Sequence, residues 1–212
     1  MSPRPCEVSW FGALCDDDYE FLGVPDSALA SSFEHCRNTA LTAEKRGFDN
    51  LLLPSGYALG IDTFVFGAAM APILKRMRLL AATRCGEMWP PQLARQIATL
   101  DRLLSRLDDA EGAAIRNRSL DSRSVGVRRQ AELRQAAAGD GFVEDNLWTG
   151  IGRARSGCGA AIVGDPDQVL AKLNAYRALG MEAFILSGYP HAAEADLFAR
   201  HVLPHLEHGP LL

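Results

Sequence analysis

Four short apolar segments of this chain each end in polar, aromatic or glycine residues that could bind a ligand or take part in catalysis. The first ends in Trp10 and Phe11, the second in Pro54-Ser-Gly, the third in Arg84, and the fourth in Ser187-Gly-Tyr-Pro-His191. If these segments are parallel strands, their carboxyl ends meet at one edge of a sheet, which is where parallel α/β folds bind ligands. The pattern therefore predicts a ligand site at this edge. Four ordinary strand-to-helix turns are the alternative.

A glycine-rich segment at residues 146–159, Asn-Leu-Trp-Thr-Gly-Ile-Gly-Arg-Ala-Arg-Ser-Gly-Cys-Gly, contains Arg153 and Arg155. A guanidinium donates hydrogen bonds in a planar fork that matches a phosphate or a sulfonate. A flexible loop can also close over such a ligand and exclude water. An ordinary glycine-rich surface loop is the alternative. The segment has neither a P-loop pattern nor a GxGxxG after a strand, so it does not support a nucleotide motif.

The histidines and the acidic run do not predict a metal site. His201 and His205 are four residues apart and could share one helix face, but no HExxH glutamate accompanies them. Exposed helix residues are therefore the preferred interpretation. Asp16-Asp-Asp18 follows the first apolar segment and is interpreted as a solvated loop. His191 differs from the other histidines because it follows the fourth apolar segment, so it is a candidate catalytic residue.

The elements that must position these residues alternate between strand and helix. Short apolar runs predict buried strands at residues 8–12, 50–54, 77–83 and 183–188. Apolar stripes with capping residues predict helices at about 33–47, 90–104, 165–180 and 192–205. Strands that alternate with helices indicate an α/β protein with a parallel sheet. No strand is predicted between residues 105 and 145, whose charged, Arg- and Ala-rich sequence favours surface helices.

Composition narrows the class of protein. The chain has 212 residues, of which 48% are hydrophobic, so it can bury a sizeable core. The formal net charge of −4 and the pI near 5.7 argue against nucleic acid as a partner. No apolar run reaches the roughly 18 residues needed to span a bilayer. The five cysteines show no CxxC spacing, which disfavours zinc or a disulfide framework and favours a reducing cytoplasm.

The strings around the predicted site resemble one known family. Residues 146–165, Asn-Leu-Trp-Thr-Gly-Ile-Gly…Gly-Ala-Ala-Ile-Val-Gly-Asp, and residues 184–191, Phe-Ile-Leu-Ser-Gly-Tyr-Pro-His, are similar to the alkanesulfonate monooxygenases of the bacterial luciferase-like family. Leu53-Pro-Ser-Gly and residues 94–103, Ala-Arg-Gln-Ile-Ala-Thr-Leu-Asp-Arg-Leu, match the same family. The resemblance covers about residues 5–105 and 120–206, which is most of the chain.

The resemblance implies a (β/α)₈ barrel enzyme that takes reduced FMN from a separate flavin reductase. Such enzymes use the flavin and oxygen to cleave the C–S bond of a small organic sulfonate, giving an aldehyde and sulfite. By position, the resemblance implies three catalytic residues, Arg155, Tyr189 and His191. It also implies flavin and substrate contacts from the strand ends, which are Trp10, Ser55, Arg84 and Ser187.

The chain departs from the family in the middle. Barrel strands four to seven, with the family's phosphate-binding segment and its Arg-x-His, have no counterpart, and a complete barrel typically takes about 250 residues. We therefore expect one luciferase-like domain over 1–212, made of βα units (1–105), a helical connection (106–145), and a loop, last strand and helix (146–212). The expected fold is an incomplete barrel whose parallel strands run in the order three–two–one–eight.

The missing strands have two consequences. Two sheet edges and the barrel-interior face lose their cover, which predicts either a homo-oligomer or helices from 106–145 folded across the gap. Because these strands are missing, a second function is possible as an alternative to the monooxygenase. The alternative is a catalytically impaired remnant that binds flavin or a protein partner, for example a full-length paralogue.

Overall fold

The computed structural model describes residues 5–21, 24–56, 60–84, 88–104, 141–151 and 160–211. The chain divides into two compact units. We call Arg4–Glu111 with Glu182–Leu212 the sheet unit, and Met1–Pro3 with Gly112–Met181 the small unit. The expectation of one domain with internal boundaries at 105 and 145 stays a prediction.

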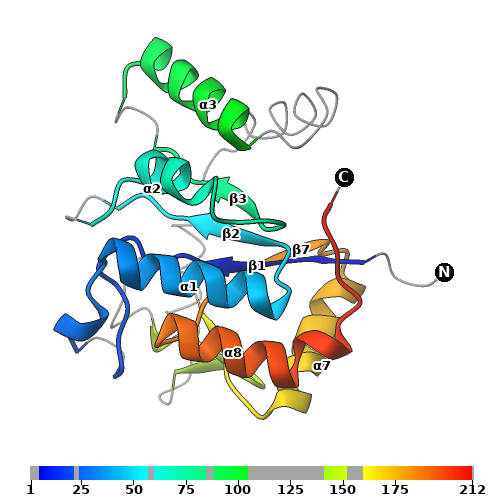
Figure 1. The fold of residues 1–212 in the computed structure, drawn as a ribbon. Helices are drawn as coiled ribbons and strands as arrows, with labels where there is room; N and C mark the ends of the chain where they lie inside the picture. The colour runs from blue at the N-terminus through cyan, green and yellow to red at the C-terminus, as the bar shows by residue number, and fades with distance from the viewer. Residues whose placement is uncertain are drawn as a thin grey trace. The chain divides into compact units, whose positions relative to one another are not determined.

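The sheet unit is built on four parallel strands (Figure 1). They are β1 (Glu7–Phe11), β2 (Asn50–Leu53), β3 (Arg78–Ala81) and β7 (Ala183–Leu186), in the order β3-β2-β1-β7. The register places Trp10 opposite Leu51 on one side and Leu186 on the other. The predicted α/β fold with a partial barrel is confirmed, and the predicted strand order matches the one observed.

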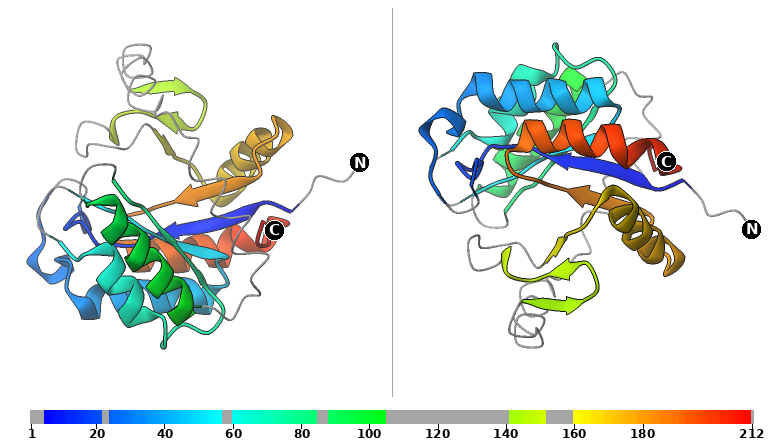
Figure 2. Two further views of the ribbon diagram at one scale, coloured as in Figure 1. Left: turned by 90° about the horizontal axis from the view of Figure 1, so that it is seen from above. Right: turned by 90° about the horizontal axis from the view of Figure 1, so that it is seen from below.

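The helices α1 (Phe33–Arg46) and α8 (His191–His201) pack against each other on one face of this sheet (Figure 2). The strand residues that point toward this side are almost fully buried, namely Val8, Trp10, Leu51 and Leu53. Removing each such side chain from water contributes about 1.5–3 kcal/mol, so this layer supplies much of the core of the unit.

Local signals set the ends of α1. The side chain of Ser32 accepts a hydrogen bond from the backbone N–H of His35 and caps the first turn. Gly47 ends the helix in the left-handed conformation, with φ of 88°, which a residue without a Cβ adopts at little cost. The predicted helix and its stop at Gly47 are observed.

Two further helices follow β2 and β3 and contact each other. They are α2 (Thr63–Met70), capped by the Asp62 side chain, and α3 (Pro90–Leu104). The sequence pattern predicted α3 through its apolar stripe and its Pro90-Pro91 entry. It did not locate α2, because Thr-Phe-Val-Phe-Gly-Ala-Ala-Met is apolar nearly all round and has no 3.6-residue period.

Within its described residues, the small unit contains a three-stranded antiparallel sheet and one helix. Its strands, in the order β4-β5-β6, are β4 (Phe142–Glu144), β5 (Leu147–Trp148) and β6 (Ala161–Ile162). The expectation that residues up to 145 lack a strand is therefore wrong at Phe142–Glu144. The segment at 146–159 was expected to be a loop, but it begins with β5 and its residues 152–159 lie outside the described chain. Most of the predicted 106–145 helices also lie outside the described residues.

The helix of the small unit, α7 (Pro166–Ala178), begins as predicted. The Asp165 side chain accepts from the Gln168 N–H, and the Gln168 side chain accepts from the Asp165 N–H, which completes a capping box. Gly180 follows the helix with φ of 95°. The last predicted helix, 192–205, is α8 followed by a short 3₁₀ turn, η2 (Leu203–His205). An earlier 3₁₀ turn, η1 (Ser27–Leu29), precedes α1.

The four-stranded sheet is not closed into a barrel within the described chain. There, β3 pairs with β2 alone and β7 pairs with β1 alone. None of the described helices has both the length and the apolar character that a membrane span requires.

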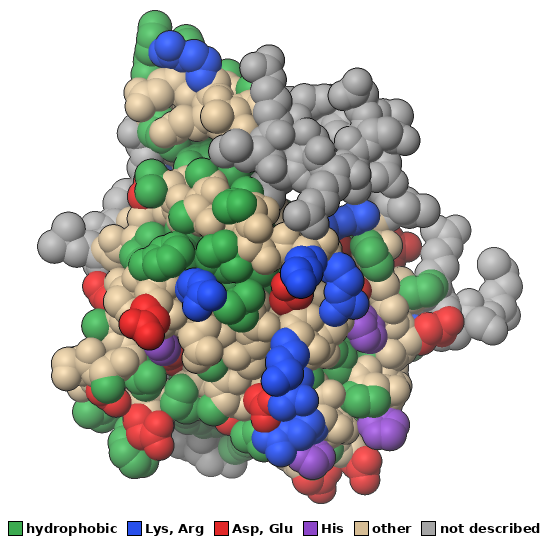
Figure 3. Space-filling view, viewed as in Figure 1, with side chains coloured by type: hydrophobic (Ala, Val, Ile, Leu, Met, Phe, Trp, Pro, Cys, Tyr) green, Lys and Arg blue, Asp and Glu red, His purple; other side chains and the backbone are tan. Residues whose placement is uncertain are grey.

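Several Lys and Arg side chains gather over the carboxyl-terminal halves of α1 and α8 (Figure 3). Within this region Arg46 of α1 and Arg200 of α8 both pair with Asp196. Exposed ion pairs contribute at most about 1 kcal/mol, so this cluster orients the two helices more than it stabilises the fold.

Glu44 ties the end of α1 to the turn before β3. Its carboxylate accepts hydrogen bonds from the backbone N–H groups of Lys75, Arg76 and Met77 at 2.7, 2.8 and 3.1 Å. Burial acts to raise the pKa of Glu44, but the N–H donors outweigh it and hold this pKa below its usual value of 4.5.

A carboxyl whose folded-state pKa is lowered stabilises the fold above its unfolded pKa, and that stabilisation is lost as the pH falls through the folded pKa. We therefore expect Glu44→Gln to lower the melting temperature at neutral pH, and the difference from the wild type to shrink below pH 4.5. Thermal unfolding followed by circular dichroism across this range measures it, with the exposed Glu34→Gln as the matched control. A difference that stays constant with pH would contradict this role of Glu44.

Candidate functional site

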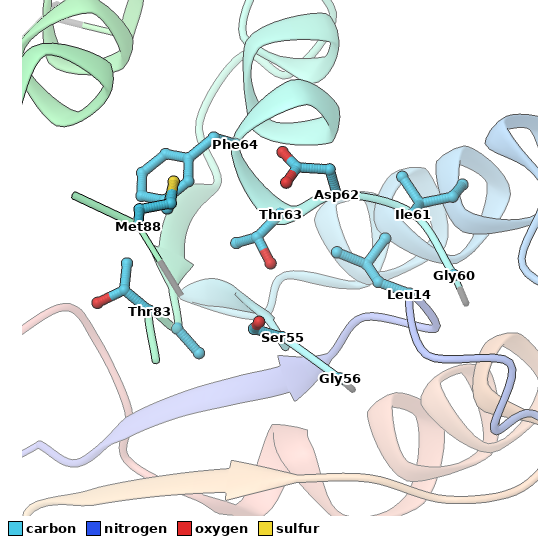
Figure 4. A pocket seen from close by; sticks show the side chains of 11 residues that line it. Leu14, Ser55, Gly56, Gly60, Ile61, Asp62, Thr63, Phe64, Thr83 and Met88 are labelled. Atoms are coloured by element: carbon cyan, nitrogen blue, oxygen red, sulfur yellow. The ribbon is translucent and has the colours of Figure 1, made fainter. Parts of the chain in front are cut away.

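A pocket of about 290 Å³ lies at the carboxyl ends of β2 and β3, beside the start of α2 (Figure 4). Phe64 and Met88 lie together on one side of it, Leu14 lies on the other, and Ser55 and Thr63 lie between them. The full lining is Leu14, Ser55, Gly56, Gly60, Ile61, Asp62, Thr63, Phe64, Ala82, Thr83 and Met88. The pocket thus combines apolar walls with several hydroxyl groups at the predicted edge of the sheet.

The polar side chains around the pocket are held by hydrogen bonds to the loop after β2. The Thr63 hydroxyl donates to the backbone carbonyl of Pro54 at 2.8 Å. Arg84, from the loop after β3, donates through Nε to the carbonyl of Ser55 at 2.8 Å. The structure therefore brings the predicted site residues Ser55 and Arg84 together at the ends of two neighbouring strands.

The pocket wall at Gly60 depends on a close backbone approach. The Ile61 N–H donates to the Leu14 carbonyl at 2.9 Å, which joins the loop after β2 to the loop after β1. A Cβ on Gly60 would meet the same Leu14 oxygen at 2.2 Å. A glycine is therefore required at this position for the two loops to meet.

An aromatic cluster occupies the carboxyl ends of β1 and β7. The ring of His191 stacks on Phe11 with centroids 5.6 Å apart and contacts Tyr189 at 4.9 Å. Tyr189 also contacts Tyr19 at 5.6 Å. Two of the predicted catalytic residues, Tyr189 and His191, are thus brought together, and His191 is fully buried.

Asp18 joins this cluster to α1. Its carboxylate accepts from the backbone N–H of His191 at 2.8 Å and from that of Tyr19 at 3.0 Å, and it contacts His35 Nε2 at 2.8 Å. Asp17 and Asp18 are 7% and 3% exposed, so the interpretation of this run as a solvated loop is wrong for both. The sequence pattern missed the role of His35, because its partner lies on a separate loop.

Cys36, one turn into α1, presents a buried thiol that is not suited to nucleophilic chemistry. Burial raises its pKa to about 12, a hydrogen bond with Ser31 opposes this rise, and the carboxylates of Asp16, Asp17 and Asp18 add to it. Its Sγ lies 2.9 Å from the carbonyl oxygen of Ala13. The reactive form of a cysteine is the thiolate, so Cys36 serves packing.

The remaining predicted site residues are not gathered at the pocket. Trp10 is buried on the helix-covered side of the sheet against Phe48 and Phe198, and its Nε1 donates to the His191 carbonyl at 3.1 Å. Ser187 is exposed at the carboxyl end of β7. Arg155 lies outside the described residues.

Where residues are described, no group of three or more His, Cys, Asp or Glu side chains could hold a metal ion. His201 and His205 are both exposed, as the sequence interpretation expected.

Comparison with known proteins decides the family. A family model described as luciferase-like monooxygenase matches residues 21–105. The chain is also 42% identical to a sulfoquinovose monooxygenase from Novosphingobium aromaticivorans, in an alignment that covers 100% of this chain and 99% of that protein. The chain belongs to the luciferase-like monooxygenase family. A sulfoquinovose monooxygenase from Agrobacterium fabrum is 34% identical, over 95% of this chain and 90% of its own length.

These comparisons refine the predicted resemblance. The family is confirmed, and the chain is an enzyme of that family. Both relatives are named for sulfoquinovose rather than for an alkanesulfonate. The alignments run over 360 and 345 residues, which exceeds the 212 residues of this chain, so stretches of both relatives have no counterpart here.

The described residues fit the flavin that a luciferase-like monooxygenase implies. Leu14, Phe64 and Met88 offer apolar surface to a planar ring system. The hydroxyls of Ser55 and Thr83 offer hydrogen bonds to ring heteroatoms. Arg84, held beside Ser55, brings a cation that suits an anionic group at this end of the sheet.

Proposed function

We propose that this chain is the oxygenase component of a two-component, reduced-FMN-dependent monooxygenase that cleaves the C–S bond of an organic sulfonate. Bound reduced flavin, supplied by a flavin reductase, provides the two electrons that activate oxygen. One oxygen atom is added to the carbon that carries the sulfonate, and the other is released as water. Breaking the C–S bond then gives an aldehyde and sulfite. The observation that carries the proposal is the similarity to two sulfoquinovose monooxygenases, over 100% and 95% of this chain.

We further propose that the substrate is a sulfonated sugar such as sulfoquinovose rather than a simple alkanesulfonate. The names of both relatives favour this class. The lining is compatible with it, since the Thr63 hydroxyl, which donates to the Pro54 carbonyl, can still accept a hydrogen bond from a substrate hydroxyl at the pocket.

The aromatic cluster suits the residues predicted to be catalytic. The Tyr189 hydroxyl can donate to an oxygen atom of the substrate or of bound oxygen. His191 is held at two backbone atoms, its N–H by Asp18 and its carbonyl by Trp10. We therefore assign Trp10 to positioning His191 and keep Ser55, Arg84 and Ser187 as the proposed cofactor contacts.

Arg155 is the proposed sulfonate contact, and the same glycine-rich segment offers a control. Arg155→Ala is expected to lower kcat/KM at least about tenfold, because one charge-assisted hydrogen bond to a sulfonate is worth about 1.5–3 kcal/mol. The melting temperature should stay within error of the wild type, since a charged side chain in a glycine-rich segment is expected to contribute little to the core. Arg153→Ala removes the same charge two residues away and should cost much less activity. Equal losses in both variants, or parallel losses of activity and melting temperature, would contradict this role.

Sulfite release tests the proposed reaction and its substrate together. The purified chain, FMN, a flavin reductase, a nicotinamide reductant and oxygen are mixed with sulfoquinovose or with hexanesulfonate, and sulfite is titrated with a thiol reagent. We expect sulfoquinovose to give the faster release. Faster release from hexanesulfonate would overturn the substrate class. Reduced flavin that binds without sulfite release from either compound would favour the flavin-binding remnant instead, a function that the unmatched stretches of the relatives already favour.

A further inference from the structure

The four-stranded sheet presents a second face, opposite α1 and α8, that carries apolar side chains into solvent. Side chains alternate between the faces of a strand, and the register places Phe11, Leu52 and Leu80 on one row of this second face. Ile185 lies beside Ser9 on the neighbouring row. Leu80 and Ile185 are 43% and 51% exposed. This face therefore combines an apolar row with a row in which Ile185 accompanies the polar Ser9, Asn50 and Arg78, and it is incompletely covered at Leu80 and Ile185.

Both edges of the sheet offer backbone groups to a further strand. The N–H groups of Arg78 and Ala82 donate inward, to the carbonyls of Asp49 and Leu53. Successive residues of a strand direct their backbone N–H and C=O groups to opposite sides. The backbone groups of Leu79 and Ala81 therefore point away from β2, at the edge of the sheet formed by β3. In the described chain β7 likewise pairs on one side only, with β1.

The two edges complement each other under two-fold symmetry. A two-fold axis parallel to the strands places β3 of one copy beside β7 of a second copy, and the reverse on the opposite side. All eight strands then stay parallel and no edge is left, whereas an axis perpendicular to the strands would pair them antiparallel. Eight parallel strands is also the number that closes with side chains filling the interior.

We propose that two copies of this chain close one eight-stranded parallel barrel, with β3 of each copy paired to β7 of its partner. The second faces of the two sheets then form the barrel interior, which buries Leu80 and Ile185 of both copies. The carboxyl ends of all eight strands lie at one mouth, so each pocket is completed from across the barrel by the same edge of the other copy. This inference rests on the sheet alone and holds whether or not the chain cleaves sulfonates.

The first test is the mass in solution by light scattering, followed by charged variants on the interior face. We expect the wild type at twice 23.0 kDa. Leu80→Glu and Ile185→Lys should each weaken the dimer at least about tenfold, because each replaces a buried apolar contact of the barrel interior with an unpaired charge. Val65→Glu, at an apolar residue of α2 that is 66% exposed, is the matched control and should leave the dimer intact.

Mixing the two variants tests the geometry itself. A Leu80→Glu copy and an Ile185→Lys copy place opposite charges at one β3–β7 junction and leave the other junction wild type. The mixed dimer should therefore form when neither variant dimerises alone. Ala81→Pro provides a variant without added charge, since it removes only an outward donor of β3 and should also weaken the dimer. Circular dichroism confirms that each variant is folded.

Three results would overturn the proposal. The first is a folded wild-type monomer, whose own residues would then cover the second face. The second is a dimer that survives Leu80→Glu, Ile185→Lys and Ala81→Pro. The third is a mixture of the two charged variants that stays monomeric although each variant is folded, because that result excludes pairing of β3 with β7.

Discussion

Replacing Asp18 with alanine is expected to lower the free energy of unfolding by about 3–5 kcal/mol, because it breaks a buried network of hydrogen bonds. The Asp18 carboxylate is 3% exposed and accepts from the N–H groups of Tyr19 and His191 while it contacts His35. The alanine variant leaves these groups buried without their acceptor, which carries the full desolvation cost of each. The loss should also free the amino end of α8, and with it the proposed catalytic His191.

Chemical denaturation of the wild type, Asp18→Ala, His35→Ala and the double variant measures this effect and its coupling. The two single losses should add up to more than the loss of the double variant, because both remove the same contact. Glu34→Ala, an exposed residue next to His35 on α1, is the control and should change stability by less than about 1 kcal/mol. An Asp18→Ala variant as stable as Glu34→Ala would show that Asp18 does not hold these loops.

The second large effect is expected at Gly60, in the pocket wall. A Cβ there would lie 2.2 Å from the Leu14 carbonyl oxygen and 3.3 Å from Cys15 Cα, both backbone atoms that cannot rotate away. Gly60→Ala must therefore push apart the loops after β1 and β2 and break the Ile61–Leu14 hydrogen bond. We expect a loss of about 1–3 kcal/mol in stability and at least a tenfold weaker affinity for reduced flavin.

Gly209→Ala supplies the matched control for this substitution. A Cβ on Gly209 would meet nothing within 4 Å, so the variant should unfold and bind flavin as the wild type does. Thermal unfolding and flavin titration compare the two variants side by side. If Gly60→Ala behaves like Gly209→Ala in both measurements, the close approach at Leu14 does not shape the site.

The fold was predictable where the sequence pattern is local. Buried parallel strands are continuous apolar runs, so Asn50–Leu53 and Ala183–Leu186 stand out from their surroundings. The capping box at Asp165 and the left-handed Gly47 mark helix ends without any knowledge of the tertiary structure. The short strands of the small unit were missed because two or three residues carry no usable period.

The site was predictable only in part, because burial and pairing at the site depend on residues distant in the chain. The sequence placed Ser55, Arg84, Tyr189 and His191 after strands, where the structure has them, and their roles stay predictions. Asp18 was missed, since a run of three aspartates is usually solvated and its contact with His191 joins residues 173 positions apart. Trp10 was predicted to contact the flavin, but it lies on the face of the sheet that α1 and α8 cover. The sequence of a buried strand does not show which of the two faces of the sheet the helices cover.

An anaerobic titration of the purified chain with reduced FMN, followed by protein fluorescence, tests most directly whether this incomplete barrel keeps the flavin site of its family. We predict saturable binding in the micromolar range, weakened by Gly60→Ala and unchanged by Gly209→Ala. Absence of binding at high flavin, by a chain that circular dichroism shows to be folded, would contradict the proposed monooxygenase and leave only its ancestry.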